Sequence, residues 1–281
     1  MTQLPRISFE FFPPKTDKGR ENLKNTRKQL AELNPEYFSV TFGAGGSTQN
    51  YTLDTIKEIQ AESRVDAAPH LSCIGSTREN IHQLLTEYQS AGVHRIVSLR
   101  GDIPEGMADT GEFHFANELI GYIRETTGDH FHIEVAAYPE VHPEATSAIT
   151  DLENFKRKVE SGANGAITQY FYNIDAYFYF VDACEKIGVN LPIVPGIMPI
   201  TNYQQLSNFS SVCGAQIPRW LDKKLQSYGD DLESIRSFGL EFVTEMCQRL
   251  LDQGAPGLHF YTLNKSEACV AIYRELNLSA S

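Results

Sequence analysis

The segment "ISFEFFPPK" (residues 7–15) has the alternating pattern of a short β-strand that ends at two prolines. Side chains alternate along a strand, so Phe9 and Phe11 are expected on one face and Glu10 on the other. The proline pair cannot donate backbone hydrogen bonds and therefore ends the strand. Burying an uncompensated carboxylate is costly, so Glu10 needs either a structural ion-pair partner or a chemical role.

Similar apolar runs recur along the chain, separated by segments with the i, i+3, i+4, i+7 spacing of amphipathic helices. The eight candidate strands are RISFEFF (6–12), YFSVTFG (37–43), DAAPHLSC (66–73), HRIVSLRG (94–101), HIEVAAYP (132–139), GAITQYF (165–171), LPIVPGI (191–197) and GLHFYTL (257–263). This alternation predicts an α/β fold in which residues 1–281 form a single (β/α)8 barrel. The long segment 198–256 predicts at least two extra helices before the eighth strand.

A doubly wound dinucleotide-binding fold is the structural alternative. It requires GxGxxG between an early strand and its helix. The nearest match is "TFGAGGST" (41–48), where Gly43 and Gly45 fit but Thr48 replaces the third glycine. A loop after the second strand explains this segment equally well, and the barrel is favoured.

The composition indicates a globular protein of the cytoplasm. The net charge of −12 argues against a general nucleic-acid or acidic-membrane surface, without excluding a local basic pocket. No apolar run approaches membrane-spanning length, and the first ten residues lack the apolar stretch of a signal peptide. The five cysteines are scattered without a CxxC pair, which predicts reduced thiols.

Polar residues gather where the predicted strands end, which is where barrel enzymes build their active sites. These residues are Glu10, Thr41, His70, the Arg100-Gly101-Asp102 turn, Tyr138 with His142, and Gln169. Each one alone has a structural explanation: Glu10 as a buried ion-pair partner, for example, or His70 as a core histidine. Their shared position at one end of the barrel predicts a functional site.

The helical segment "DLENFKRKVESG" (151–162) places Asp151, Asn154 and Lys158 on one stripe, with Arg157 beside it. Taken alone, this stripe is explained better by a solvent-exposed helix face than by a binding site. The nearby segment "YPEVHPEA" (138–145) alternates acids with a histidine but lacks the histidine pair of a helical zinc site, and no metal site is predicted. A serine hydrolase is poorly supported because GxSxG is missing.

Eight segments, in order along the whole chain, resemble the successive motifs of bacterial methylenetetrahydrofolate reductase. They are "SFEFFPPK", "SVTFGAGG", "APHLSCIG", "RGDIP", "AAYPEVHPE", "LENFKRKVESGANGAITQYFY", "PGIMPI" and "HFYTLNKSE". The resemblance implies a (β/α)8 barrel with tightly bound, non-covalent FAD that reduces 5,10-methylenetetrahydrofolate to 5-methyltetrahydrofolate by ping-pong transfer from NADH or NADPH. It also implies a homo-oligomer that supplies methyl groups for methionine synthesis. The chain stops soon after the eighth barrel unit, so we expect it to lack the regulatory domain of eukaryotic relatives.

The resemblance also assigns roles to individual residues. Glu10 matches the general acid, and Asp102 matches a carboxylate that tunes the flavin and contacts the pterin. The residues that match FAD contacts are Thr41, His70, Arg100, Gly101, Asp102, Phe115, Tyr138, His142, Asp151, Asn154, Arg157 and Lys158, with Ala163 just beyond. Those that match folate contacts are Glu10, Asp102, Gln169, Gln205, Phe209 and Lys265, of which Phe209 also stacks on bound nicotinamide dinucleotide.

Two residues depart from the family pattern. Lys265 stands where relatives have an arginine that meets the folate glutamate tail, so the charge is kept but the bidentate fork is lost. Phe115 stands where an FAD-contacting tyrosine can occur, and it cannot make a hydroxyl hydrogen bond.

The implied reaction gives Glu10 a purpose, because opening the methylene bridge requires a proton on the leaving folate nitrogen. A partly buried carboxyl near other acids is expected to have a raised pKa. Two alternatives stay open. One is another barrel enzyme of flavin or pterin chemistry, resembling proline dehydrogenase or a pterin-dependent transferase, and the other is a folate-binding protein without turnover. The choice between NADH and NADPH is also open.

Overall fold

The computed structural model describes residues 5–42, 49–103 and 110–278, and every structural statement below concerns these ranges. The glycine-rich match at Gly43, Gly45 and Thr48 lies outside them. In the described part of the chain, no helix is both long enough and apolar enough to cross a membrane.

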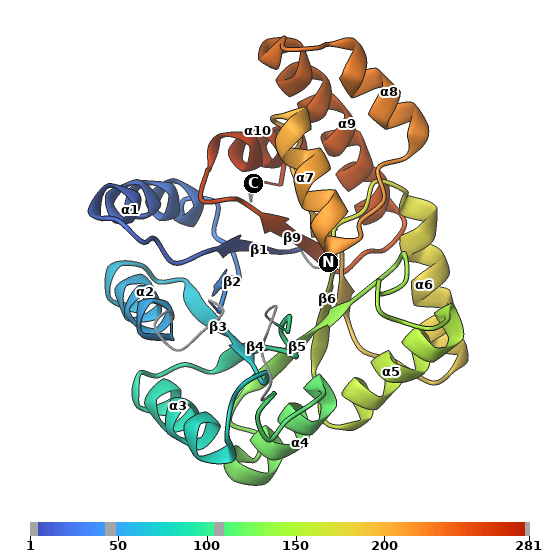
Figure 1. Cartoon of the computed structure of the whole chain (residues 1–281). Helices are drawn as coiled ribbons and strands as arrows, with labels where there is room; N and C mark the ends of the chain where they lie inside the picture. The colour runs from blue at the N-terminus through green and yellow to red at the C-terminus, as the bar shows by residue number, and fades with distance from the viewer. Residues whose placement is uncertain (1–4, 43–48, 104–109, 279–281) are drawn as a thin grey trace.

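The strands form one parallel sheet in the order β7-β6-β5-β4-β3-β2-β1-β9-β8. They are β1 Arg6–Phe11, β2 Tyr37–Val40, β3 Asp66–Ser72, β4 Arg95–Leu99, β5 His132–Ala137, β6 Gly165–Thr168, β7 Ile193–Val194, β8 Gly196–Ile197 and β9 Gly257–Tyr261. Helices surround this sheet as an outer ring (Figure 1). The predicted (β/α)8 barrel is confirmed.

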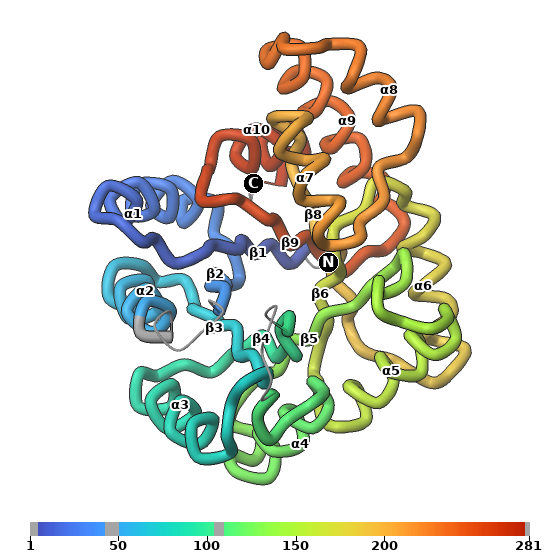
Figure 2. The backbone as a smooth tube through the Cα atoms, in the orientation of Figure 1, coloured from blue at the N-terminus to red at the C-terminus, as the bar shows by residue number. Residues whose placement is uncertain are grey.

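The predicted seventh strand, residues 191–197, is split into β7 and β8. Pro195 separates the two pieces because it has no backbone N–H for the ladder. β7 pairs with β6 on one side, and β8 pairs with β9 on the other. The carbonyl of Pro195 accepts a hydrogen bond from His259 N (3.0 Å). The two ends of the sheet are thus consecutive pieces of one segment, and β8 and β9 lie side by side near α7, Tyr203–Cys213 (Figure 2).

The remaining helices follow the strands in sequence. They are α1 Asp17–Ala31, α2 Gln49–Glu62, α3 Arg78–Ser90, α4 Ala116–Thr127, α5 Ala148–Glu160, α6 Ile174–Lys186, α8 Arg219–Ser227, α9 Leu232–Asp252 and α10 Glu267–Glu275. Threonine and serine side chains begin several of them by accepting a backbone N–H, as Thr77 does from Asn80 N (3.2 Å) and Ser147 from Thr150 N (3.1 Å). Between β8 and β9 the chain forms α7, α8 and α9, which project together at one side of the ring (Figure 1).

Strand β1 has the two faces that its sequence predicts. Phe9 and Phe11 are buried on the outer face of the sheet, where Phe9 stacks on Phe260 at 5.5 Å between ring centroids. Ser8 and Glu10 lie on the opposite face, next to His259 of β9. The alternation therefore places the carboxylate of Glu10 inside the barrel.

The amino-terminal end of the barrel is closed by a network of charges. Glu134 is 1% exposed, and its carboxylate lies 2.7 Å from Arg95 and 3.0 Å from His132. Arg95 also pairs with Glu36 at 2.6 Å, and Glu36 pairs with Arg6 at 2.6 Å. This network lies at the end of the barrel opposite to the predicted site. Glu36 and Glu134 therefore act as structural ion-pair partners, which is the alternative role considered above for Glu10.

Candidate active site

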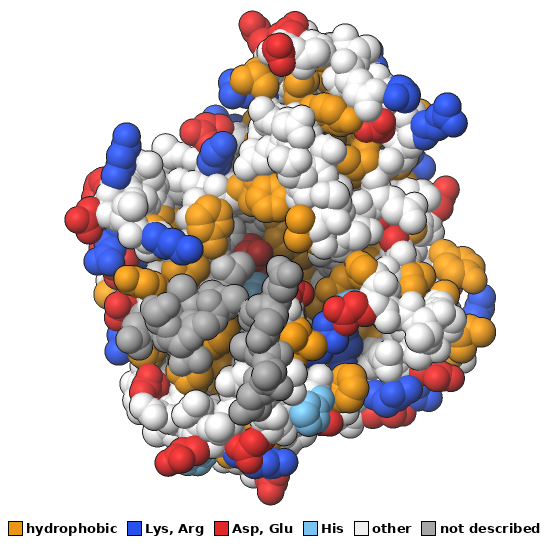
Figure 3. Space-filling model, in the orientation of Figure 1, with side chains coloured by type: hydrophobic (Ala, Val, Ile, Leu, Met, Phe, Trp, Pro, Cys, Tyr) orange, Lys and Arg blue, Asp and Glu red, His pale blue; other side chains and the backbone are white. Residues whose placement is uncertain are grey.

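A cavity of about 460 Å³ opens at the carboxyl ends of the strands. Eight of the residues predicted from the sequence line it: Glu10, Thr41, His70, Gly101, Asp102, Tyr138, Gln169 and Phe209. In the space-filling view this face is hollowed at its centre, and acidic and histidine side chains lie in the hollow among hydrophobic ones (Figure 3). The residues from distant parts of the sequence therefore meet at one place, as predicted.

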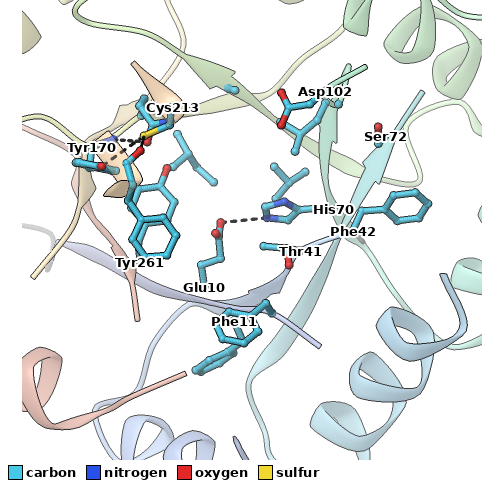
Figure 4. Close-up of a pocket in the computed structure, with 18 of the residues that line it drawn as sticks. Glu10, Phe11, Thr41, Phe42, His70, Ser72, Asp102, Tyr170, Cys213 and Tyr261 are labelled. Atoms are coloured by element: carbon cyan, nitrogen blue, oxygen red, sulfur yellow. Dashed lines mark hydrogen bonds and ion pairs between the residues drawn. The ribbon is translucent and has the colours of Figure 1, made fainter. Parts of the chain in front are cut away.

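Glu10 is held between two buried imidazoles. Its Oε2 lies 3.2 Å from Nε2 of His70, which is 6% exposed (Figure 4), and 3.5 Å from Nε2 of His259, which is fully buried. On its other side, Nδ1 of His259 lies 2.7 Å from the hydroxyl of Ser8. Ser8, His259 and Glu10 thus form a hydrogen-bonded chain across β1 and β9. Sequence reasoning missed His259, although its inward position follows from the alternation of "GLHFYTL".

The expectation that the pKa of Glu10 is raised is wrong. Burial by itself raises this pKa, but the positive charge of His70 and the contacts with His259 outweigh it and lower the pKa to about 2. The expectation assumed acidic neighbours, whereas the groups beside the carboxylate are imidazoles. Glu10 is therefore an anion at neutral pH.

A loop after β9 fixes the backbone at Glu10 and just after it. The hydroxyl of Thr262 donates to the carbonyl of Glu10 (2.6 Å). The side chain of Asn264 accepts from Phe12 N (3.0 Å) and donates to the carbonyl of Phe12 (2.9 Å). Lys265 follows directly in this loop. The carboxylate is consequently carried on a stretch of β1 that cannot move independently of the loop.

Asp102 lies across the cavity from Glu10 (Figure 4). It follows Gly101, whose φ of +85° is a left-handed conformation that favours glycine. A Cβ at Gly101 would lie 2.0 Å from the hydroxyl of Ser72, so the close contact between these two strand ends also requires glycine. Burial raises the pKa of Tyr138 to about 12, with the negative charge of Asp102 as the next cause. Tyr138 therefore stays protonated beside this acid.

Lys158 reaches the same end of the barrel from α5. Its Nζ donates to the carbonyl of Ala136 (2.5 Å), which lines the cavity. Burial lowers the pKa of Lys158 to about 8, although Asp151 acts in the opposite direction. Asp151 accepts from the backbone N–H of His142 (2.9 Å). Within the described ranges Lys158 has no ion-pair partner, so this partly buried cation suits an anionic ligand.

Other predicted FAD contacts lie outside the cavity lining. Arg100 is paired with Glu144 at 2.7 Å at the rim. Asn154 and Arg157 are exposed on α5, and Arg157 lies 3.8 Å from Glu153. Phe115 is 58% exposed at the start of α4. The ring of His142 packs on Tyr138 (4.4 Å between centroids), and burial lowers the pKa of His142. The stripe predicted on α5 is thus partly buried at Lys158 and exposed at Asn154 and Arg157.

The predicted folate contacts occupy the side of the cavity near α7. Gln169 and Phe209 line it, and Phe209 is 41% exposed. Gln205, four residues before Phe209 on α7, is half-buried but is not in the lining. Lys265 borders a second, adjoining cavity.

An acid between two imidazoles faces a partly apolar cavity at the carboxyl end of a (β/α)8 barrel, which is where barrel enzymes place their active sites. The described residues contain no group of three or more histidines, cysteines or acids that could hold a metal ion. The sequence model of the family "Methylenetetrahydrofolate reductase" matches residues 2–277. The chain belongs to this family and is an oxidoreductase.

Curated relatives extend over nearly the whole chain. It is 39% identical over 272 residues to the 5,10-methylenetetrahydrofolate reductases of Salmonella typhimurium and Escherichia coli, covering 97% of this chain and 90% of each relative. It is also 39% identical over 285 residues to methylenetetrahydrofolate reductase (NADH) 1 of Arabidopsis thaliana, where the match covers 97% of this chain and 48% of the plant protein.

Solved structures share the fold. A Clostridium thermocellum protein, described as binding two copies of 5-methyl-5,6,7,8-tetrahydrofolic acid, has a TM-score of 0.70 at 18% identity, with 98% of this chain and 96% of that chain covered. A dihydropteroate synthase of Coxiella burnetii in complex with pteroic acid has a TM-score of 0.53 at 12% identity, with 99% and 94% covered. At these identities the likeness concerns the barrel alone.

Proposed function

We propose that this protein reduces 5,10-methylenetetrahydrofolate to 5-methyltetrahydrofolate with electrons from NADH or NADPH, passed through bound FAD in a ping-pong cycle. Family membership supports the reaction. The observation that carries the residue assignment is Glu10 held 3.2 Å from His70 at the floor of the cavity, with Asp102 across from it.

The residues around the cavity fit a flavin dinucleotide. Lys158 offers a cation without an ion-pair partner in the described ranges, and its lowered pKa of about 8 indicates that an anion would stabilise its charged form. Gly101 lines the cavity, where its backbone can meet a bound ring. We assign Lys158, Tyr138, His142, Thr41 and Gly101 to holding the FAD. When bound, the FAD supplies the hydride chemistry.

The cluster of Glu10, His70 and His259 supplies the proton for the folate half-reaction. Cleavage of the methylene bridge requires protonation of the leaving folate nitrogen, which frees an iminium carbon to accept the hydride. Glu10 faces the cavity with His70 and His259 beside its carboxylate, so it can pass a proton from this cluster to the folate nitrogen. Ser8 orients His259 through its hydroxyl contact with Nδ1 (2.7 Å).

Reductant and folate use the same side of the cavity in turn. Phe209 and Gln169 offer an aromatic face and an amide at its wall, and these suit the flat, hydrogen-bonding ring of either substrate. One cavity that accepts both ligands in succession accounts for the ping-pong order. Asp102 and Glu10 lie where a pterin between them would meet a carboxylate at each side.

An anaerobic titration tests the proposal. The purified protein is expected to show an FAD spectrum that NADH or NADPH bleaches and that 5,10-methylenetetrahydrofolate restores, with one 5-methyltetrahydrofolate formed per flavin. A colourless protein with full activity would contradict the flavin assignment. Bleached protein that the folate fails to reoxidise would contradict the reaction and favour a binding protein without turnover.

A further inference from the structure

A buried tyrosine just after β6 connects two side chains of the cavity wall. Tyr170 lines the cavity next to Gln169. The backbone N–H of Tyr170 donates to Oε1 of the Gln169 side chain (3.0 Å). Because an N–H can bond only to the oxygen of an amide, this contact fixes which end of the amide faces the backbone. The NH2 group is the end that a ligand can meet.

The hydroxyl of Tyr170 reaches in the other direction, to helix α7. It lies 3.0 Å from the hydroxyl of Ser210, which is also buried. The thiol of Cys213, one turn further along α7, lies 3.4 Å from the same phenol oxygen (Figure 4). Burial raises the pKa of Tyr170, so the phenol keeps its proton for this contact. Separating two buried hydroxyls that satisfy each other is costly, and the pair therefore ties α7 to the end of β6.

Phe209, which directly precedes Ser210, depends on this tie for its position. Its ring lines the cavity but is 41% exposed, so the packing of the ring itself holds it only in part. The placement of α7 has to supply the rest. The carboxyl end of α7 packs against the loop after β5, where Gly214 has a φ of +73° and a Cβ on it would lie 2.3 Å from Cγ of Pro143. The hydroxyl pair holds the turn that carries Phe209 against β6.

We propose that Tyr170 is a positioning residue, which holds the amide of Gln169 and the ring of Phe209 as one wall for the flat ring of the substrate. This inference rests on the proposed reduction of methylenetetrahydrofolate, in which both side chains meet the ligand. Tyr170 acts through its neighbours: its main chain orients the amide, and its hydroxyl places the helix that carries the aromatic ring. Loss of the hydroxyl should therefore weaken ligand binding without slowing proton or hydride transfer in the bound complex.

The test removes the hydroxyl pair from either side in the FAD-loaded protein. The variants are Tyr170→Phe, Ser210→Ala and the double variant. The control is Tyr177→Phe, which removes another buried tyrosine hydroxyl, one that donates to the carbonyl of Ile193 (2.8 Å) and lies outside the cavity lining. Stopped-flow measurement of flavin reoxidation by 5,10-methylenetetrahydrofolate gives two quantities for each protein. The half-saturating folate concentration reports binding, and the limiting rate reports the chemical step.

Tyr170→Phe and Ser210→Ala are each expected to raise the half-saturating folate concentration by roughly 3- to 10-fold, the range for the net loss of one hydrogen bond. Both should keep the limiting rate within about twofold of the wild type. The double variant should bind no more weakly than either single variant, because all three remove the same contact. Tyr177→Phe should change neither quantity.

Four results would overturn the inference. They are an unchanged half-saturating concentration in Tyr170→Phe, a limiting rate that falls with it, single effects that add in the double variant, and an equal shift in the Tyr177→Phe control. The last of these would assign the effect to a general loss of stability. A wild-type protein whose reduced flavin the folate fails to reoxidise would instead overturn the proposed function, which is a distinguishable result.

Discussion

The carboxylate of Glu10 lies 3.2 Å from Nε2 of His70, although the two residues belong to strands β1 and β3 and are separated by β2. The contact crosses the inside of the barrel. It favours the ionised form of Glu10, so the acid–base behaviour of this carboxyl depends on its two imidazole neighbours.

The lowered pKa of Glu10 predicts a pH-dependent share of stability. The folded-state pKa of about 2 lies below the ordinary value of 4.5, so this share is fully present above pH 4.5 and is lost as the pH falls toward 2. Glu10→Gln removes it. Urea unfolding should give a stability difference between wild type and variant of up to about 3 kcal/mol at pH 5, shrinking steadily to pH 2. A difference that stays constant over this range would show that the imidazoles do not stabilise the carboxylate.

Lys158 is predicted to serve ligand binding at the expense of stability. Its pKa, lowered from 10.5 to about 8, means that burial of the cation destabilises the fold below pH 8, and that this cost fades as the pH rises to 10.5. Lys158→Met should therefore bind FAD more weakly by tenfold or more, yet the flavin-free protein should be about 1–3 kcal/mol more stable at pH 7.

Lys156→Met is the matched control for Lys158. Lys156 also lies on α5 and also donates to a carbonyl, that of Ile187 (2.9 Å), but it is not at the cavity. Equilibrium dialysis of FAD and denaturant unfolding of both variants give the comparison. Equal FAD loss in the two variants would assign Lys158 a purely structural role.

The charge network at the amino-terminal end of the barrel is predicted to serve stability and not ligand binding, the reverse of Lys158. Arg95→Met leaves Glu134, which is 1% exposed, without its contact at 2.7 Å. Breaking a buried pair in this way costs about 3–5 kcal/mol. The denaturation midpoint should fall accordingly. The folded variant should keep kcat/KM for NADH and for 5,10-methylenetetrahydrofolate within a few-fold of the wild type. A selective loss of the folate half-reaction would mean that the network is coupled to the site.

The sequence predicts the repeating architecture well because each unit has its own local signal. Strand β1 shows this: the alternation of Phe9, Glu10 and Phe11 correctly places the acid inside the barrel. The break at Pro195 was missed, although the lack of a backbone N–H in proline was available as a signal.

Contacts between distant segments were harder to predict. Ser8 and His259 meet across a separation of 251 residues, and only the register of β1 against β9 brings them together. The identity of the groups beside Glu10 decides the sign of its pKa shift, and this cannot be read from strand ends alone.

The central claim, that Glu10 delivers a proton in the folate half-reaction, is tested most directly by stopped-flow measurement of the two half-reactions of Glu10→Gln. Glutamine keeps the shape of the side chain but cannot deliver the proton. Reduction of the flavin by NADH needs no such proton and should proceed at near the wild-type rate. Reoxidation by 5,10-methylenetetrahydrofolate should fall by the ~10²–10⁴-fold typical of a lost general acid. Parallel loss in both halves would contradict the account and make Glu10 a structural partner of His70 and His259.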